Sequence, residues 1–174
     1  MPALLVVCTG NASRSAMAGT MLEWLARARG IPLAVTTAGT HAVDGQPMGA
    51  RTSSALCSVA EMTDAPVGRH RSRQLAPADV AHVDLVVAME ADHVRYVRRH
   101  HPAAAPLAGT LRRLCRDLEP GPAPLGTRVR ALDLAHVELD VDEDVADPAG
   151  PDDAAYVACA AELWVLCNEL VRRL

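Results

Sequence analysis

The chain has 174 residues, of which 50% are hydrophobic, and a formal net charge of −4 at pH 7. This length and composition suit one domain with its own core, and two domains would be cramped. The negative net charge argues against a general nucleic-acid-binding protein. We therefore expect a single domain over residues 1–174 that does not bind nucleic acid.

The N-terminus shows no basic start followed by an apolar segment and a cleavage site, and no apolar run approaches the roughly 20 residues that span a bilayer. All 17 basic residues are arginine, which beside the abundant alanine suggests a bacterial genome rich in GC. The five cysteines are an odd number without the spacing of a zinc site or a disulfide framework. We predict a cytoplasmic bacterial protein with no membrane partner; its oligomeric state is left open.

Apolar runs alternate with helical patterns along the chain. The first run, Ala3 to Val7, predicts a buried strand, and helical spacing follows from Ser15. Residues 119–126, rich in proline and glycine, predict a mobile surface loop, and Tyr156 to Leu174 repeat apolar residues at helical spacing. Further strands are predicted at 34–38, 85–88 and 104–107.

This alternation predicts an α/β fold in which a central parallel sheet of about four strands is flanked by helices. The loop between the first strand and the first helix then lies at the C-terminal edge of the sheet. Open α/β folds bind their ligands at that edge. The residues of this loop are therefore the first candidates for a functional site.

The loop reads Cys8-Thr9-Gly10-Asn11-Ala12-Ser13-Arg14-Ser15. Gly10 and Asn11 tolerate the backbone angles of a tight turn, so the loop amides and the start of the helix would converge. Such a nest of N–H groups attracts an oxyanion and favours the thiolate form of a cysteine within it. The pattern predicts a phosphate site that contains its own nucleophile.

Arg14 follows Cys8 by six positions, so a curled loop can point both side chains at one bound anion. A guanidinium stays protonated and offers a planar fork to two phosphate oxygens. The alternative is an inert buried cysteine with a surface arginine nearby, which is common for a lone cysteine. Strand, loop, arginine and helix coincide here, and this favours the phosphate site.

The loop resembles the phosphate loop of low-molecular-weight protein tyrosine phosphatases. Asp147-Pro148-Ala149-Gly150, followed by Tyr156 and a C-terminal helical pattern, is similar to the general-acid loop of that family. The resemblance spans nearly the whole chain, because intermediate segments also resemble the family at 37–40, 70–74 and 84–89.

The resemblance implies a cysteine-dependent phosphatase that hydrolyses phosphate monoesters, above all protein phosphotyrosine, through a phosphocysteine intermediate. Its partners would be a phosphorylated protein or a small phosphate ester, and it implies no metal and no cofactor. Cys8 would be the nucleophile, Arg14 would bind the phosphate, and Asp147 would be the general acid and base. Thr37 and His70 would hold the side chains of Asn11 and Ser15 in position. The expected phosphate-binding residues are Thr9, Gly10, Asn11, Ala12, Ser13 and Ser15.

Two of these residues have alternative interpretations. Asp147 ends an acidic run over residues 138–147, which could be a solvated loop or a weak cation site. His70 lies in a basic segment and could be a surface histidine. The Pro-x-Gly context after Asp147 and its distance from the last helix favour catalysis.

The sequence departs from the family pattern at three places. Many members carry a second cysteine directly before the arginine, where this chain has Ser13, so a disulfide within the loop is impossible. The expected pocket-wall positions hold His41, Val43 and Ala149 instead of aromatic residues, and Ala12 replaces a bulkier floor residue. Loss of ring stacking removes about 0.5 to 1.5 kcal/mol per contact, which weakens substrate preference but not phosphate chemistry.

Other functions fit the same loop. An arsenate reductase of this fold normally needs resolving cysteines on a flexible segment, and Cys57 and Cys115 do not form such a pair. A protein-arginine phosphatase fits, although the sequence offers no residue that selects phosphoarginine. A catalytically idle phosphoprotein-binding module is the alternative from another class. It has little need for Cys8, Arg14 and Asp147 together.

Overall fold

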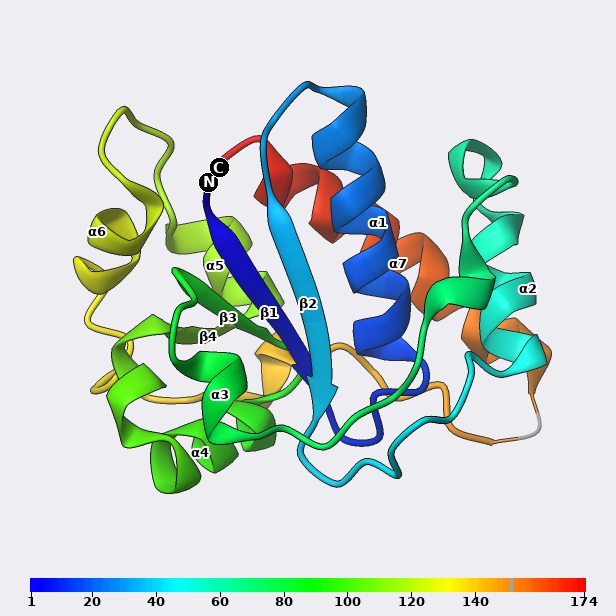
Figure 1. The fold of residues 1–174 in the computed structure, drawn as a ribbon, viewed down its shortest axis with the longest axis horizontal. Coiled ribbons are helices and arrows are strands. Elements are labelled where there is room, and N and C mark those ends of the chain that lie inside the picture. The colour runs from blue at the N-terminus through cyan, green and yellow to red at the C-terminus, as the bar shows by residue number, and fades with distance from the viewer. Residues whose placement is uncertain (151) are drawn as a thin grey trace.

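The computed structural model describes residues 1–150 and 152–174. In this part of the chain, parallel strands form one sheet in the order β2-β1-β3-β4. This arrangement, drawn in Figure 1, confirms the predicted α/β fold with a four-stranded parallel sheet. The strand bounds are β1 Ala3–Cys8, β2 Ala34–Gly39, β3 Leu85–Ala88 and β4 Ala108–Thr110.

Helices and 3-10 segments connect and cover the strands. The α-helices are α1 Arg14–Ala28, α2 Ala50–Ser58, α3 Pro77–Val80, α4 Ala91–His100, α5 Leu111–Asp117, α6 Leu125–Arg130 and α7 Asp153–Val171. The 3-10 segments are η1 Ala60–Met62, η2 Val67–Arg69, η3 Pro102–Leu107 and η4 Val141–Glu143.

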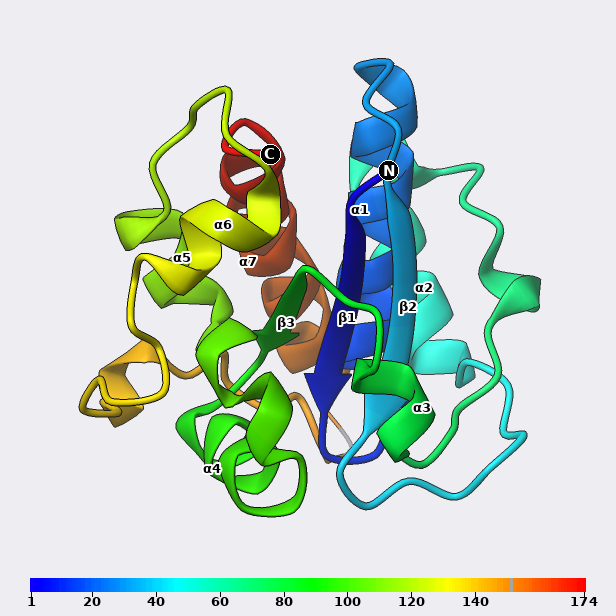
Figure 2. The same cartoon turned by 60° about the vertical axis from the view of Figure 1, so that its left-hand side comes forward.

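The core lies on both faces of the sheet, because alternate residues of a strand point to opposite faces. Leu4 and Val6 of β1 pack with the apolar faces of α1, α5 and α7. Leu5 and Val7 pack on the other face with Val94 and Val97 of α4. The helices on the two sides can be followed in Figures 1 and 2. With both faces covered, β1 is buried almost throughout.

The end of β1 fixes the position of the candidate loop. Cys8 is the last residue of β1 and pairs in register with Gly39 at the end of β2. A Cβ atom at Gly39 would lie 2.5 Å from the carbonyl oxygen of Thr9 and 2.9 Å from the amide nitrogen of Asn11. Position 39 therefore requires glycine, because the backbone of the loop passes directly over it.

The helix α7 closes the core. It packs against α1, α2 and α5, and its buried residues include Cys159, Leu163 and Cys167. The helix has 19 residues, and an 18-residue window within it has a mean hydropathy of 1.4, so it meets the length and composition of a membrane-spanning helix and the expectation that no run comes near that length was wrong. A helix packed into a protein core meets the same criterion, so this feature is weak evidence for a membrane span.

Two predicted boundaries were also wrong. Residues 104–107 lie in η3, and β4 begins at Ala108, because Pro106 cannot donate to a strand ladder. The exposed loop predicted over 119–126 ends at Pro124, since Leu125 and Gly126 are buried in the first turn of α6. The Thr127 amide donates to the Pro124 carbonyl at 3.0 Å and so starts this helix within the predicted loop.

Candidate active site

Asn11 braces the loop between β1 and α1. It is fully buried and has a φ of 51°, in the left-handed region that asparagine tolerates better than most residues. Its side-chain oxygen accepts from the amide of Arg73 at 3.0 Å, and its carbonyl oxygen lies 2.7 Å from Nε2 of His70. The loop is thus fixed to the segment that precedes α3 through contacts of Asn11 with His70 and Arg73.

Cys8 and Ser15 lie against each other beneath the loop. Cys8 is 3% exposed, and its Sγ is 2.9 Å from Oγ of Ser15. Nδ2 of Asn11 donates to the same Ser15 oxygen at 2.9 Å. Because this oxygen already accepts from Asn11, the hydroxyl hydrogen of Ser15 is available to the sulfur. The three side chains form a chain of polar contacts that ends on the candidate nucleophile.

Arg14 is buried beside these three side chains, with 2% of its own side chain exposed. Its Nη1 donates to Glu90 and, at 2.9 Å, to the carbonyl oxygen of Val145. Its Nη2 donates to Oδ2 of Asp147 at 2.7 Å. These partners come from two distant parts of the chain, and they fix the position of the guanidinium.

Glu90 and His93 are site residues that sequence reasoning missed. Nε2 of His93 lies 2.9 Å from Oγ1 of Thr9 and 3.5 Å from Oε2 of Glu90. Burial, together with the nearby charge of Arg14, lowers the pKa of His93 to about 3, so the ring is neutral. A signal was available for Glu90, because an acidic residue after a buried parallel strand lies at the ligand-binding edge of the sheet.

Asp147 lies at the rim of the site. Its side chain is 43% exposed, its Oδ2 binds Arg14, and its Oδ1 accepts from the amide of Ala149 at 3.1 Å. The structure therefore brings together Cys8, Arg14 and Asp147, which the sequence analysis selected as the catalytic residues. Their roles remain proposals.

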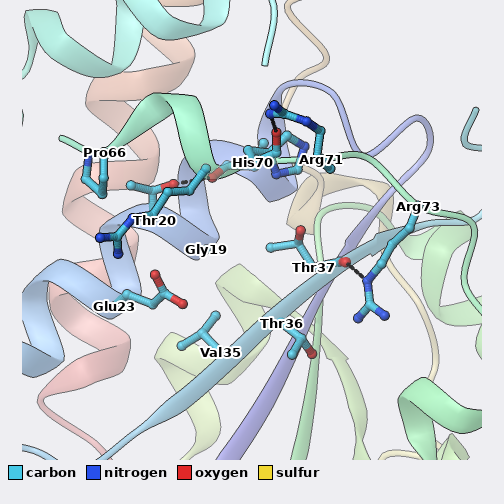
Figure 3. A pocket seen from close by; sticks show the side chains of 12 residues that line it. Gly19, Thr20, Glu23, Val35, Thr36, Thr37, Pro66, His70, Arg71 and Arg73 are labelled. Carbon is cyan, nitrogen blue, oxygen red and sulfur yellow. Dashed lines mark hydrogen bonds between the residues drawn. The ribbon is translucent and has the colours of Figure 1, made fainter. Parts of the chain in front are cut away.

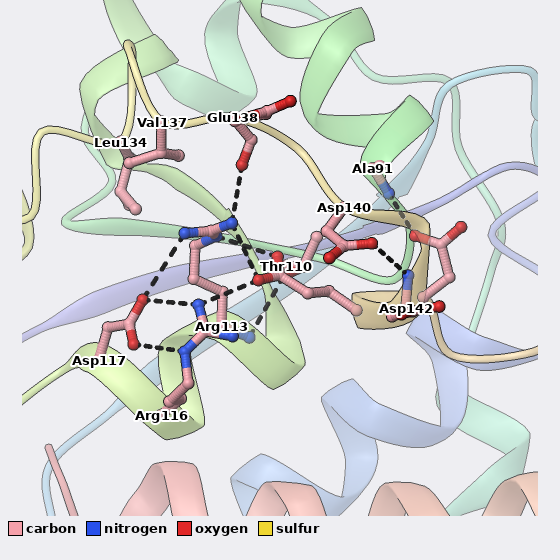
Figure 4. Close-up of polar contacts among 12 residues, drawn as sticks. Ala91, Thr110, Arg113, Arg116, Asp117, Leu134, Val137, Glu138, Asp140 and Asp142 are labelled. Carbon is pink, nitrogen blue, oxygen red and sulfur yellow. Dashed lines mark hydrogen bonds and ion pairs between the residues drawn. The ribbon is translucent and has the colours of Figure 1, made fainter.

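Two other residues of the acidic run, Glu143 and Asp144, anchor the segment that carries Asp147. Glu143 is buried and binds Thr110, Arg113 and Arg116. Figure 4 labels these three partners. Oδ1 of Asp144 accepts from the amide of Ala91 at 2.7 Å, at the start of α4. These two carboxylates therefore bind the protein itself, which weakens the alternative of a solvated loop.

Thr37 does not have the predicted role. No hydrogen bond joins it to Asn11 or Ser15 among the described residues, and its carbonyl oxygen instead accepts from Nε of Arg73 at 2.8 Å. Its side chain lines a cavity of about 310 Å³ between α1 and β2, which Figure 3 shows with His70 and Arg73. The prediction was wrong because β2 presents this side chain to Gly19 of α1.

Of the three predicted wall residues, His41 contacts the loop through its backbone. His41 and Ala149 are exposed, and Val43 is 69% exposed. The amide of His41 donates to the carbonyl oxygen of Thr9 at 2.8 Å, and its ring meets Tyr96 edge-on with 5.7 Å between ring centres. Tyr96 thus supplies an aromatic neighbour that the sequence did not predict, because it comes from α4.

The other buried thiols differ from Cys8 in their surroundings. Burial raises the pKa of Cys115 to about 11 and that of Cys159 to about 12, and it raises the pKa of Cys167 still further. These cysteines are packing residues, as expected from their positions. A thiol with a pKa this high is a poor nucleophile near neutral pH.

The fold and this site together place the chain among α/β proteins whose anion-binding loop is built around a cysteine. A sequence model of the low molecular weight phosphotyrosine protein phosphatase family matches residues 3–117. The chain belongs to this family. The matched range includes Cys8 and Arg14, whereas Asp147 lies beyond it.

Individual relatives agree with this assignment. The probable low molecular weight protein-tyrosine-phosphatase EpsP of Ralstonia nicotianae is 30% identical over 101 residues. That match covers 58% of this chain and 63% of the relative, which is less than two thirds of its length.

Solved structures match over the whole chain. The low molecular weight protein tyrosine phosphatase from T. tengcongensis has a TM-score of 0.79 and 26% identity, with both chains covered completely. The YwlE arginine phosphatase from Geobacillus stearothermophilus has a TM-score of 0.75 and 25% identity, covering 99% of this chain and 92% of that one.

Proposed function

We propose that residues 1–174 form one phosphatase domain that hydrolyses phosphate monoesters, foremost protein phosphotyrosine, with Cys8 as the nucleophile. The observation that carries the proposal is the position of Arg14. Its guanidinium is buried at the loop that holds Cys8 and is bonded to the carboxylate of Asp147 at 2.7 Å. Nucleophile, phosphate-binding group and acid are therefore in reach of one substrate.

In the first step, the Cys8 thiolate attacks phosphorus while the bond to the leaving oxygen breaks. Asp147, which takes up a proton once the substrate phosphate replaces it on Arg14, gives that proton to the leaving oxygen, and the phosphoryl group is left on sulfur as a phosphocysteine. The charge on the equatorial oxygens is stabilised by Arg14 and the loop amides, because phosphoryl transfer depends mainly on positioning and electrostatics.

In the second step, water attacks the phosphocysteine. The Asp147 carboxylate takes a proton from this water, inorganic phosphate leaves, and the Cys8 thiolate is restored. Ser15 supports the thiolate before its attack and again as it leaves in the second step, through its hydroxyl, which lies 2.9 Å from the sulfur. The two steps use water and these side chains alone, and no cofactor is part of the proposal.

Arg14 keeps donors for a substrate. Both Nη1 contacts and one Nη2 contact are made within the protein, to Glu90, Val145 and Asp147. The Nε hydrogen and the second Nη2 hydrogen have no partner among the described residues. These two donors form one edge of the guanidinium fork, which matches two oxygens of a phosphate group.

A second candidate is a protein-arginine phosphatase, because a structural neighbour of 25% identity is described as one. The experiment is a panel of an aryl phosphate, a phosphotyrosine peptide, phosphoarginine and arsenate with a thiol donor, each run with a Cys8→Ser control. We expect the phosphotyrosine peptide to be the best substrate. Preference for phosphoarginine would select the second candidate, arsenate turnover would indicate a reductase, and binding without turnover would indicate an idle module.

The setting of this activity is also part of the proposal. We infer a cytoplasmic bacterial enzyme whose partner is a phosphorylated protein or a small phosphate ester. The odd number of scattered cysteines supports a reducing compartment. Fractionation of the source cells with an antibody against the protein tests this location.

A further inference from the structure

A hollow lies directly beside the phosphate loop and takes no part in the proposed mechanism. Its volume is about 520 Å³, and its lining is mostly apolar. We call it the Tyr156 hollow. It is lined by Ala12 and Ser13 of the loop, by residues 49–52 at the start of α2, and by Tyr156 of α7.

Small side chains leave this space open. Ala12 and Ala50 contribute only methyl groups, and a Cβ atom at Gly49 would meet nothing within 4 Å. The hollow is nevertheless built from fixed parts, because Oγ of Ser13 lies 3.1 Å from Oγ1 of Thr52 and ties the loop to α2. Replacement of the bulkier floor residue by Ala12 therefore opens a site rather than a void in the core.

Tyr156 gives the hollow an aromatic wall. The residue is half-buried on the first turn of α7, which follows the loop that carries Asp147. A tyrosine ring contacts apolar groups well and attracts other rings in stacked or edge-on arrangements. The chain lacks aromatic residues at positions 149 and 150, and Tyr156 supplies a ring at a different place beside the same loop.

The rim of the hollow is joined to the loop that carries Asp147. Nε of Arg51 donates to Oδ1 of Asp153 at 2.7 Å, and its Nη1 lies 3.5 Å from the carbonyl oxygen of Gly150. Asp153 balances the charge of Arg51, so the rim does not select an acidic group. The character of the hollow is set by its apolar lining, which selects an apolar occupant.

We propose that the Tyr156 hollow is a substrate subsite that receives an apolar or aromatic side chain adjacent to the phosphorylated residue of a phosphoprotein. The inference rests on the proposed phosphatase function. The hollow shares Ala12 and Ser13 with the phosphate loop, so a peptide whose phosphate lies on Arg14 passes next to it. The substrate class is thus a phosphoprotein with a bulky apolar neighbour at the phosphosite.

The test uses phosphotyrosine peptides that differ in one residue, leucine or serine, placed directly before or directly after the phosphotyrosine. We expect the wild-type protein to favour leucine in one of these places by about three- to tenfold in kcat/KM, mainly through KM. Ala50→Leu fills the hollow from α2 and should reduce this ratio to about one, and Tyr156→Ala should lower it. Circular dichroism checks that each variant is folded.

Ser54→Leu is the matched control, because it adds the same side chain to an exposed position of α2 outside the hollow. It should keep the wild-type ratio. Turnover of p-nitrophenyl phosphate, which has no neighbouring residue, should be the same in wild type, Ala50→Leu and Ser54→Leu. Equal rates for leucine and serine peptides in wild type, or a ratio kept by Ala50→Leu, would overturn the subsite. Failure of wild type on p-nitrophenyl phosphate would instead overturn the phosphatase function.

Discussion

Nη2 of Arg14 donates a hydrogen bond to Oδ2 of Asp147 at 2.7 Å, across 133 positions of the chain. The proposed phosphate-binding residue and the candidate acid are therefore paired with each other in the structure. Asp147 is more exposed than Arg14, with 43% of its side chain accessible against 2%. The Asp147 side chain can thus leave Arg14, take up a proton and turn toward a leaving group while the guanidinium stays in place.

Asp147→Asn should slow poor leaving groups more than good ones, because the amide cannot protonate the departing oxygen. We expect a loss of about 10²-fold or more in kcat for phenyl phosphate and a clearly smaller loss for p-nitrophenyl phosphate. Steady-state kinetics with both esters measures the difference. Asp142→Asn, an exposed position on the same acidic run, is the control. Equal losses with the two esters would show that Asp147 does not act as the acid.

Glu90→Gln should disturb the position of Arg14, because it removes the negative charge that faces the buried guanidinium. We expect kcat/KM for an aryl phosphate to fall by about tenfold or more, since small displacements of a binding group are costly in catalysis. Inhibition by inorganic phosphate should weaken in parallel. Glu61→Gln, at an exposed position, should leave both unchanged. Unchanged phosphate inhibition in Glu90→Gln would argue against a positioning role.

His93 should make stability depend on pH. Its pKa falls from 6.5 to about 3 on folding, so between these values the unfolded chain binds a proton that the folded protein does not. The contribution of His93 to stability is therefore complete above about pH 6.5 and is lost as pH falls toward 3. His70 and His101 also have lowered pKa values and add to the same trend.

His93→Gln should flatten this trend. Urea unfolding at about pH 7, 5.5 and 4.5 should show a slope of the unfolding free energy that is smaller than in wild type, by up to about 1.4 kcal/mol per pH unit. His136→Gln is the control, because that side chain is 80% exposed. A variant with the wild-type slope would mean that His93 is protonated in the folded protein.

Peroxide should inactivate the protein in a way that thiols reverse only in part. Ser13 cannot form a disulfide with Cys8, and the raised pKa values of Cys115 and Cys159 disfavour their reaction. The sulfenic acid of Cys8 then proceeds to irreversible acids or to a disulfide outside the loop. Activity is measured after peroxide and again after dithiothreitol.

The oxidised Ser13→Cys variant should regain its activity in dithiothreitol, because the substitution places a resolving cysteine in the loop. The prediction fails if oxidised wild type recovers completely while mass spectrometry finds neither an intermolecular bridge nor a bridge to Cys57.

The sequence was sufficient to predict the sheet and the loop, because β1, the glycine and asparagine of the turn, and Arg14 are contiguous and act locally. It was not sufficient for Glu90, the N-terminal cap of α4, or for His93 within α4, because both come next to the loop only after the sheet has formed. The role predicted for Thr37 from its position in the sequence was wrong, because the strand directs its side chain toward Gly19. The strand predicted over residues 104–107 does not form, because Pro106 cannot donate to a strand ladder despite the apolar pattern around it.

Turnover of p-nitrophenyl phosphate by wild type and by Cys8→Ser shows whether Cys8 is the nucleophile. Cys57→Ser is the matched control, since it makes the same change in a half-buried cysteine outside the loop. We predict that Cys8→Ser loses activity by about a thousandfold or more while Cys57→Ser keeps it. Wild-type turnover by Cys8→Ser would contradict the account.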